Sequence, residues 1–459
     1  MPVRNVVAMQ TAEMRERRLG GTEQNWCRAV PGGTGIVALG ILYSVKLTEG
    51  FLARLESYLQ KIRSRNPILN SKLRWDYTTK TFHFLHSSSL KIQVSNLSST
   101  YELLGRIGSS SPKLSPFQLL LEHELNLNCW VDGHCKGKEL VYATIYELED
   151  EKSLLVLRFH VSACDRTTAA AMLNQLLDLM EEDKNADRVD GLSLPIEELI
   201  PEEITKKSIW ERGVDVLSYS MASLRLSYLP FKDTKSSRSS QVVRIQLGRN
   251  QTKKIISECQ TRGMKLCGLL AAAGMLASLK CSSEGKMKKY GIVTLTDSRS
   301  ALKPPLPSDN FGFYHSAILN THAVKRGEKL WELAERCYQA FATLKMKKRH
   351  FTDMADLNFL MIKAIDNPGL TSSSAMRTSL MSIFEDTVID NSDEVRRKVR
   401  VEDYMGCASV HGVGPSIGIF DTIRDGCLDC VCAYPSPLHT REQMEDLVSE
   451  MKKIMESDI

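Results

Sequence analysis

The sequence has little that points to a membrane, to nucleic acid or to disorder. Its longest apolar run, Cys267–Leu279, is too short to cross a bilayer and is typical of a buried helix. Aromatic residues make up only 7%, but a hydrophobic content of 42% with 25% charged residues is ordinary for a folded globular chain. The net charge of +5 is small for 459 residues, so we expect no nucleic-acid partner.

The cysteine pattern of a disulfide-rich or zinc-binding protein is also missing. The 12 cysteines are scattered, mostly among apolar neighbours, which favours reduced, buried thiols. The tightest group, Cys427, Cys430 and Cys432, has no fourth Cys or His at zinc-finger spacing and follows Asp425-Gly426, a typical hairpin turn. We therefore expect a β-strand there and no metal. The N-terminal residues lack the apolar core of a signal peptide, and we expect a cytoplasmic protein.

Hydrophobic periodicity divides the chain into two halves that each mix helices and strands. Leu47–Arg65 has apolar residues at helical spacing, whereas Leu154–Val161 is apolar on both faces, as a central strand is. Further along, Val242–Leu247 predicts a strand and Leu266–Leu279 a helix. Because a chain of this length exceeds the size at which one core keeps growing, we expect two domains with a ligand site between them.

Between the halves the periodic pattern dissolves into charged and polar segments, which is typical of a crossover. The predicted division is an N-terminal domain over residues 1–185, a linker over 186–240 and a C-terminal domain over 241–459.

The stretch Phe159–Leu173, FHVSACDRTTAAAML, places a histidine at the end of the apolar strand. Asp165 follows His160 by five residues, and a helix begins behind it. A buried imidazole in this position is either a hydrogen-bonded structural group or a catalytic base. Asp165 is in either case suited to cap the helix by accepting from its free amides.

The motif HVSACDRTT resembles the active-site motif of acyltransferases with the chloramphenicol-acetyltransferase-like fold. These include plant acyl-CoA-dependent transferases (the BAHD family), fungal alcohol acetyltransferases and the condensation domains of peptide synthetases. Their motif is HxxxD followed by Gly, between a strand and a helix. Further stretches similar to this superfamily are LGGTEQNWCRAV with IRSRNPILNSKLRWD, TDSRSALKPPLPSDNFGFY, and SVHGVGPSIGIFDTIRDGCLDC, which is similar to plant alcohol acetyltransferase-like members. Together they cover nearly the whole chain.

This resemblance implies an α/β fold, an α+β two-layer arrangement, with two similar domains of mixed sheets and an active site in the tunnel between them. It implies O-acyl transfer from acyl-CoA to a small alcohol, with N-acyl transfer to an amine also open. Acyl-CoA is then a co-substrate, no cofactor is permanently bound, and we expect a monomer without a transmembrane segment.

The resemblance also implies roles for individual residues. His160 matches the general base, which removes a proton from the acceptor while the acyl group moves directly between two bound substrates. Asp165 matches the family's structural aspartate, and Arg299 of TDSRS matches the arginine that pairs with it. Three residues match the family's DFG turn and are expected to be structural: Asn310, Phe311 and Gly312.

Two departures from the family pattern are visible. In the first, Cys164 stands four residues after His160, where the family has its aspartate, and Arg166 replaces the glycine. We interpret it as one extra residue in the loop. In the second, Asn310 replaces the aspartate of the DFGWG-like turn and Phe313 replaces its tryptophan. His411 and His315 are secondary candidates for the base.

Two other functions stay open. One is a non-catalytic binding or regulatory relative of the same fold, and the other is a condensation-type enzyme that takes its acyl group from a carrier-protein thioester. The orientation of His160 discriminates between enzyme and binding module, because a catalytic ring must face a passage that substrates can enter.

Overall fold

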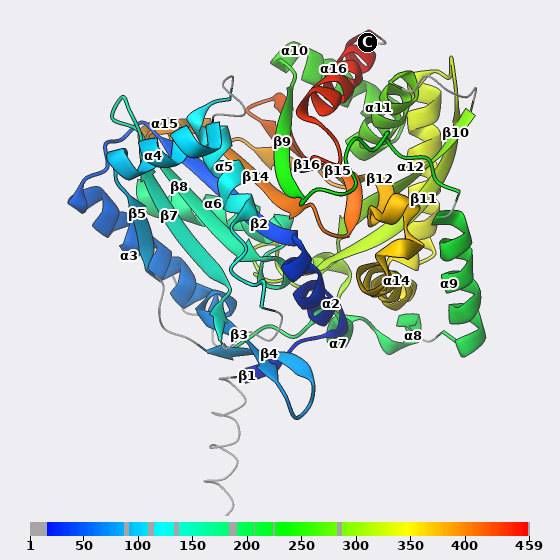
Figure 1. The fold of residues 1–459 in the computed structure, drawn as a ribbon, viewed down its shortest axis with the longest axis horizontal. Helices are drawn as coiled ribbons and strands as arrows, with labels where there is room; N and C mark the ends of the chain where they lie inside the picture. The colour runs from blue at the N-terminus through cyan, green and yellow to red at the C-terminus, as the bar shows by residue number, and fades with distance from the viewer. Residues whose placement is uncertain are drawn as a thin grey trace, which may run out of the picture.

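The computed structural model describes residues 16–86, 91–108, 114–132, 137–182, 191–205, 207–223, 225–281 and 287–457. Within these ranges the chain builds two large β-sheets and one small one, with helices packed against them (Figure 1). The predicted α/β class with mixed sheets is confirmed. Residues 1–15 lie outside the described residues, and they include most of the N-terminal segment in which we expect no signal peptide. Residues 186–190 of the predicted linker also lie outside them.

The N-terminal sheet has five strands in the order β14-β2-β8-β7-β5. All neighbours are antiparallel except β5 and β7. Figure 1 shows β14, drawn in orange, beside the blue β2, so a strand from near the end of the chain completes the first sheet. The strands are β2 (Thr34–Tyr43), β5 (Ile92–Ser95), β7 (Val141–Glu147), β8 (Ser153–His160) and β14 (Val401–Val410).

The C-terminal sheet runs in the order β11-β10-β12-β15-β16-β9, with β13 beside β15. It is mixed, since β12 is parallel to both of its neighbours and the remaining pairs along this path are antiparallel. The strands are β9 (Ser239–Gln246), β10 (Met287–Asp297), β11 (His315–Lys325), β12 (Arg377–Phe384), β13 (Val388–Asp390), β15 (Gly414–Arg424) and β16 (Cys427–Ser436).

The small sheet borders the N-terminal half and has the order β1-β4-β3-β6. Its strands are β1 (Glu16–Arg18), β3 (Ser71–Asp76), β4 (Thr81–His86) and β6 (Lys138–Glu139). The helices of the N-terminal half are α2 (Gly21–Ala29), α3 (Glu49–Arg65), α4 (Leu97–Gly108), α5 (Pro116–Asn126) and α6 (Arg166–Glu181).

The predicted crossover contains helices that the sequence pattern did not reveal, α7 (Ile196–Leu199), α8 (Glu202–Thr205) and the longer α9 (Ile209–Ser223). The domain boundaries themselves stay a prediction. The helices of the C-terminal half are α10 (Arg249–Thr261), α11 (Leu266–Lys280), α12 (Leu330–Met346), α13 (Arg349–Thr352), α14 (Met354–Asp366), α15 (Asp393–Lys398) and α16 (Arg441–Ser457).

Local sequence accounts for many of these boundaries. The Thr48 side chain accepts from the Phe51 amide to cap α3, which ends at Asn66 before a proline. The predicted hairpin around Asp425-Gly426 is confirmed: both residues have positive φ, 51° and 79°, as a tight hairpin turn requires. The cysteines after this turn lie in β16, so the predicted strand is confirmed.

Each half has its own apolar core, but the halves also share residues. The C-terminal core surrounds α11, which is buried along nearly its whole length. The N-terminal core includes Phe311 and Phe313, which come from the C-terminal half. Of the described helices, none alone is long and apolar enough to span a membrane; α10 and α11 reach that composition only as a pair bent by 108°.

Candidate active site

A cavity of about 860 Å³ lies between the two halves and receives side chains from both sheets. Its lining is mostly apolar, which suits a ligand with a hydrocarbon body. From the N-terminal half it is lined by Val37, Val161 and Asp165, and from the C-terminal half by Leu295, His315, Met361 and Phe384, among others.

Asp165 lies at this cavity and is almost completely enclosed by donors. Its side chain caps α6 by accepting from the Thr168 amide at 2.8 Å, as the sequence predicts. Arg299 Nη2 donates to Oδ1 at 3.0 Å and Nη1 lies 2.9 Å from Oδ2, with both side chains 2% exposed. The ion pair between the halves that the sequence predicts is therefore present. Burial alone would raise the pKa of Asp165, but Arg299 and His315 outweigh it and hold the pKa well below its usual range.

The loop that carries the predicted turn residues is tied to the same aspartate. Asn310 accepts through its backbone carbonyl from Arg299 Nε at 3.1 Å. The Gly312 carbonyl accepts from the Asp165 amide at 3.2 Å, and Gly312 has φ of 147°, a conformation that favours glycine. Phe311 is buried in the N-terminal core. These contacts fix the loop against the start of α6.

His160 does not point into the cavity. Its ring is fully buried, packs edge-on against Trp130 with centroids 5.3 Å apart, and is absent from the cavity lining. Nδ1 accepts from the Ser162 amide at 3.2 Å and lies 2.7 Å from the Ser162 hydroxyl, so the proton of the neutral ring lies on Nε2. Burial lowers the pKa of His160 to about 3. The catalytic role of His160 stays a prediction, but this geometry argues against it.

The end of β8 separates His160 from the cavity. His160 is the last residue of β8, and Val161 begins a short 3₁₀ turn, so the chain direction changes between the two residues. Val161 lines the cavity and stands four residues before Asp165, which is the spacing of the family motif. The interpretation of one extra loop residue between His160 and Asp165 stays a prediction.

Of the two secondary candidates, only His315 lines the cavity. It begins β11, is 5% exposed, and its Nδ1 lies 3.0 Å from Asp165 Oδ2. His411 instead packs against Gly33, and its Nδ1 lies 3.0 Å from the Ser240 hydroxyl. His315 is among the candidates from the sequence, but no feature of the sequence indicates its contact with Asp165.

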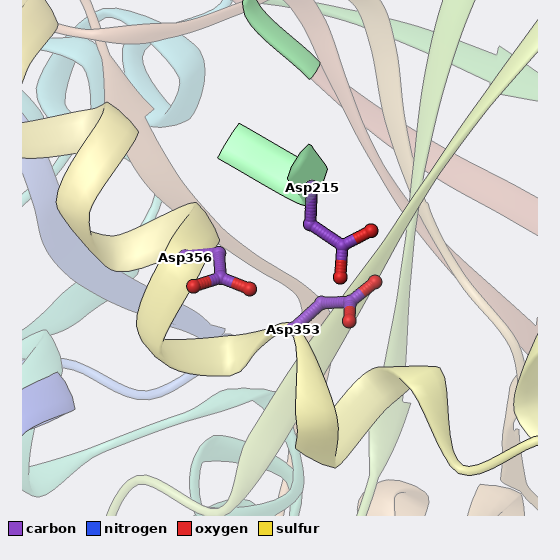
Figure 2. Close-up of side chains that lie close together, drawn as sticks. All are labelled: Asp215, Asp353 and Asp356. Carbon is purple, nitrogen blue, oxygen red and sulfur yellow. The ribbon is translucent and has the colours of Figure 1, made fainter. Parts of the chain in front are cut away.

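A cluster of three carboxylates, Asp215, Asp353 and Asp356, resembles a metal site at first sight (Figure 2). Lys207 Nζ lies 2.6, 2.6 and 2.8 Å from one oxygen of each. Burial alone would lower the pKa of Lys207, but the hydrogen bonds that its ammonium donates to the three carboxylates raise it. Since an ammonium already occupies the position between the acids, we interpret the cluster as a clamp that joins α9 to α14.

No protein-family model and no curated protein matches the sequence at a significant level. Solved structures do match. The TRI3 trichothecene 15-O-acetyltransferase from Fusarium sporotrichioides is 13% identical, with 96% of this chain and 94% of that chain covered and a TM-score of 0.70. The cyclization-docking bidomain of the EpoB peptide synthetase from Sorangium cellulosum is 14% identical, with 97% and 86% covered and a TM-score of 0.68. The first condensation domain of the calcium-dependent antibiotic synthetase is 12% identical, with 96% and 95% covered and a TM-score of 0.63.

These likenesses extend over almost the full length of each chain, so they describe the whole fold and not one motif. The chain therefore has the fold of the chloramphenicol-acetyltransferase-like and condensation-domain superfamily, as its sequence predicts.

Proposed function

We propose that this protein transfers an acyl group from a thioester to the hydroxyl or amine of an acceptor bound in the cavity. The observation that carries the proposal is an imidazole, His315, that lines an apolar cavity between the halves and is held by a buried carboxylate. The fold shared with an acetyltransferase and with condensation domains supports it. Acyl-CoA is the proposed donor. The monomeric state and the cytoplasmic location stay predictions.

His315 is the proposed general base. Its Nδ1 lies 3.0 Å from Asp165 Oδ2, so we propose the tautomer that has its proton on Nδ1, facing the carboxylate, and that leaves the Nε2 lone pair for the acceptor. The acceptor oxygen or nitrogen attacks the thioester carbonyl carbon while Nε2 takes its proton. The C–S bond then breaks, and the imidazolium returns that proton to the departing thiolate.

His160 competes for this role on the strength of the family motif. Three observations favour His315 instead: His160 is outside the cavity lining, its Nδ1 lone pair is used by Ser162, and burial lowers its pKa to about 3. A base with so low a pKa is almost never protonated near neutral pH, so it is a weak proton acceptor.

The test follows the release of free thiol from a panel of acyl-CoAs mixed with small alcohols and amines. We expect His315→Ala to lower the rate by about 10²–10⁴-fold, the usual contribution of a positioned base. His160→Ala is expected to lower stability but to keep most of the rate in the folded fraction, and the exposed His86→Ala serves as control. Loss of release in a folded His160→Ala variant, with His315→Ala still active, would return the role to His160.

A second candidate function is a non-catalytic binding module. The observation that favours it is the fully buried ring of His160, which lies outside the cavity lining, while the apolar Val161 stands in the cavity wall. A protein that binds acyl-CoA in a calorimeter but releases no thiol with any acceptor would support this candidate. Thiol release that depends on His315 would exclude it.

A further inference from the structure

The guanidinium of Arg377, at the cavity, has no carboxylate partner among the described residues. Arg377 begins β12, lines the cavity and is 1% exposed. Its Nε donates to the Ala375 carbonyl at 3.0 Å, and Nη1 donates to the carbonyls of Val410 and Pro415 at 2.9 and 2.6 Å. Nη2 is buried without a hydrogen-bond partner among the described residues. No carboxylate in the described part of the chain lies within ion-pair distance of this guanidinium.

The surroundings of Arg377 do not supply a negative charge either. The ionisable groups that act on it are the Arg238 guanidinium and the phenol of Tyr228. Burial lowers the pKa of the nearby His411, and the positive charges of Arg377 and Arg238 lower it further, to about 4. Burial and Arg238 lower the pKa of Arg377 to about 9, so the guanidinium is still charged at neutral pH.

Arg166, another arginine that lines the cavity, differs from Arg377 because it has a carboxylate partner. Arg166 lines the same cavity, and its Nη2 lies 3.3 Å from Asp421 Oδ1. A buried charge with no counter-ion is strongly unfavourable, so it is kept where an anionic ligand completes the pair. Arg377 has the free donor nitrogen that such a ligand needs, and Tyr228, which also lines the cavity, offers a hydroxyl.

We propose that Arg377 and Tyr228 bind the carboxylate of an elongated ligand whose apolar body extends along the cavity towards His315. The proposed carboxylate site defines the class of ligand that the cavity binds. It rests on the proposed function in one respect, that the cavity is the substrate site.

The position of β12 sets the length of the ligand. β12 runs from Arg377 to Phe384, whose ring centroid lies 5.6 Å from that of His315. Seven residue steps of about 3.3 Å separate the two ends of the strand by roughly 23 Å. A ligand that reaches both Arg377 and His315 is therefore a long molecule with a charged end, such as a long-chain carboxylate.

A carboxylate fits better than a phosphate of coenzyme A. Phosphate sites gather several donors around three or more oxygens, whereas Arg377 has a single nitrogen left to donate and three carbonyls already occupy its other bonds. The apolar lining of the cavity also disfavours a group with more than one charge.

The first experiment compares octanoate with octanamide by isothermal titration calorimetry on the unaltered protein. The two probes have equal length and differ in charge, and both are short enough to test the Arg377 end of the cavity alone. We expect octanoate to bind at least about tenfold more tightly, because a hydrogen bond between charged groups is worth more than a neutral one. Hexanoate should bind more weakly than octanoate, since fewer CH₂ groups are buried. Equal affinity for octanoate and octanamide would overturn the proposal.

The second experiment repeats the pair on variants. Arg377→Gln should remove the preference for octanoate, Tyr228→Phe should reduce it severalfold while leaving the guanidinium in place, and Arg54→Gln, on an exposed face of α3, should keep it. If Arg377→Gln does not fold, Tyr228→Phe still decides. A preference that survives both cavity variants contradicts the assignment. Binding of desulfo-coenzyme A that depends on Arg377, without binding of octanoate, would show that the anion is a phosphate and would also overturn it.

Thiol release separates this inference from the proposed function. A protein that selects octanoate through Arg377 but turns over no acyl-CoA keeps the carboxylate site and loses the transferase. A protein that turns over acyl-CoA through His315 but binds octanoate and octanamide alike keeps the transferase and loses the carboxylate site.

Discussion

Two regions beside the cavity bury an arginine in opposite ways. Around Asp165, the Arg299 guanidinium meets the carboxylates of Asp165 and Asp297 and the backbone carbonyl of Asn310. Around Arg377, the guanidinium meets only backbone carbonyls. Arg299 therefore has its counter-ions within the protein, whereas Arg377 has none among the described residues.

This difference between Arg299 and Arg377 indicates which role a buried charged side chain has, structural or ligand-binding. A satisfied pair such as Asp165 and Arg299 joins parts of the fold, and its loss leaves an uncompensated charge behind. An arginine held only by carbonyls is positioned but not neutralised, which suits recognition of an anion. His160 adds a third case, a titratable group that stays buried by remaining neutral.

The largest effect is expected at the paired arginine. Arg299→Ala leaves the Asp165 carboxylate buried without its main partner, and we expect the free energy of unfolding to fall by about 3–5 kcal/mol. Urea unfolding followed by circular dichroism measures it. Arg54→Ala, on the exposed face of α3, is the matched control and should stay within about 0.5 kcal/mol of the unaltered protein. An Arg299→Ala protein as stable as its parent would show that the pair contributes nothing.

The next effect depends on pH and isolates the neutral imidazole. The pKa of His160 is about 3 in the folded state and about 6.5 when unfolded, so the unfolded chain binds more protons between these values and stability falls as the pH is lowered. His160 alone should cost about 2 kcal/mol between pH 7 and pH 5. Asp165, whose pKa is depressed, loses its contribution only below its unfolded pKa of about 3.9.

The measurement is the difference in unfolding free energy between the unaltered protein and His160→Gln at both pH values. That difference should shrink by about 2 kcal/mol at pH 5, because the variant has no imidazole to titrate. His86→Gln, at an exposed position, is the control for the substitution itself. If the difference in unfolding free energy between the two proteins does not change with pH, the pKa of His160 is not lowered by folding.

The smallest effect is expected at the unmatched arginine. Arg377→Gln loses hydrogen bonds to three carbonyls but also removes a buried charge, so we expect a net change of only about 1 kcal/mol. The same urea titrations compare it with Arg299→Gln. If Arg377→Gln destabilises the protein as much as Arg299→Gln does, the contrast between a structural and a ligand-binding arginine fails.

Local signals predicted a large part of the fold and of the site. Asp165 caps α6, because few residue types next to a helix start can satisfy its free amides. Its pairing with Arg299 was expected from the resemblance to the family motif and not from local sequence. The hairpin at Asp425-Gly426 followed from turn chemistry that only a few residue types allow. The overall fold followed from motifs spread along the chain, and the structural comparisons agree with it.

The rest could not be predicted because it depends on orientation and on distant contacts. The chain turns out of β8 after His160, and this turn leaves Val161 in the cavity wall and His160 outside it. The contact between His315 and Asp165 joins residues far apart in sequence. Arg377, at the start of an apolar strand, has no local feature that distinguishes it from a surface arginine.

The pairing of β14 with β2 has a consequence for how the protein is made. On a ribosome that adds about 5–20 residues per second, β2 emerges long before β14, so one edge of an apolar strand waits roughly tens of seconds for its partner. An open edge of this kind recruits other strands. The nascent chain is therefore a natural client for a chaperone, and a truncation before Val401 should yield aggregates instead of an independent first half.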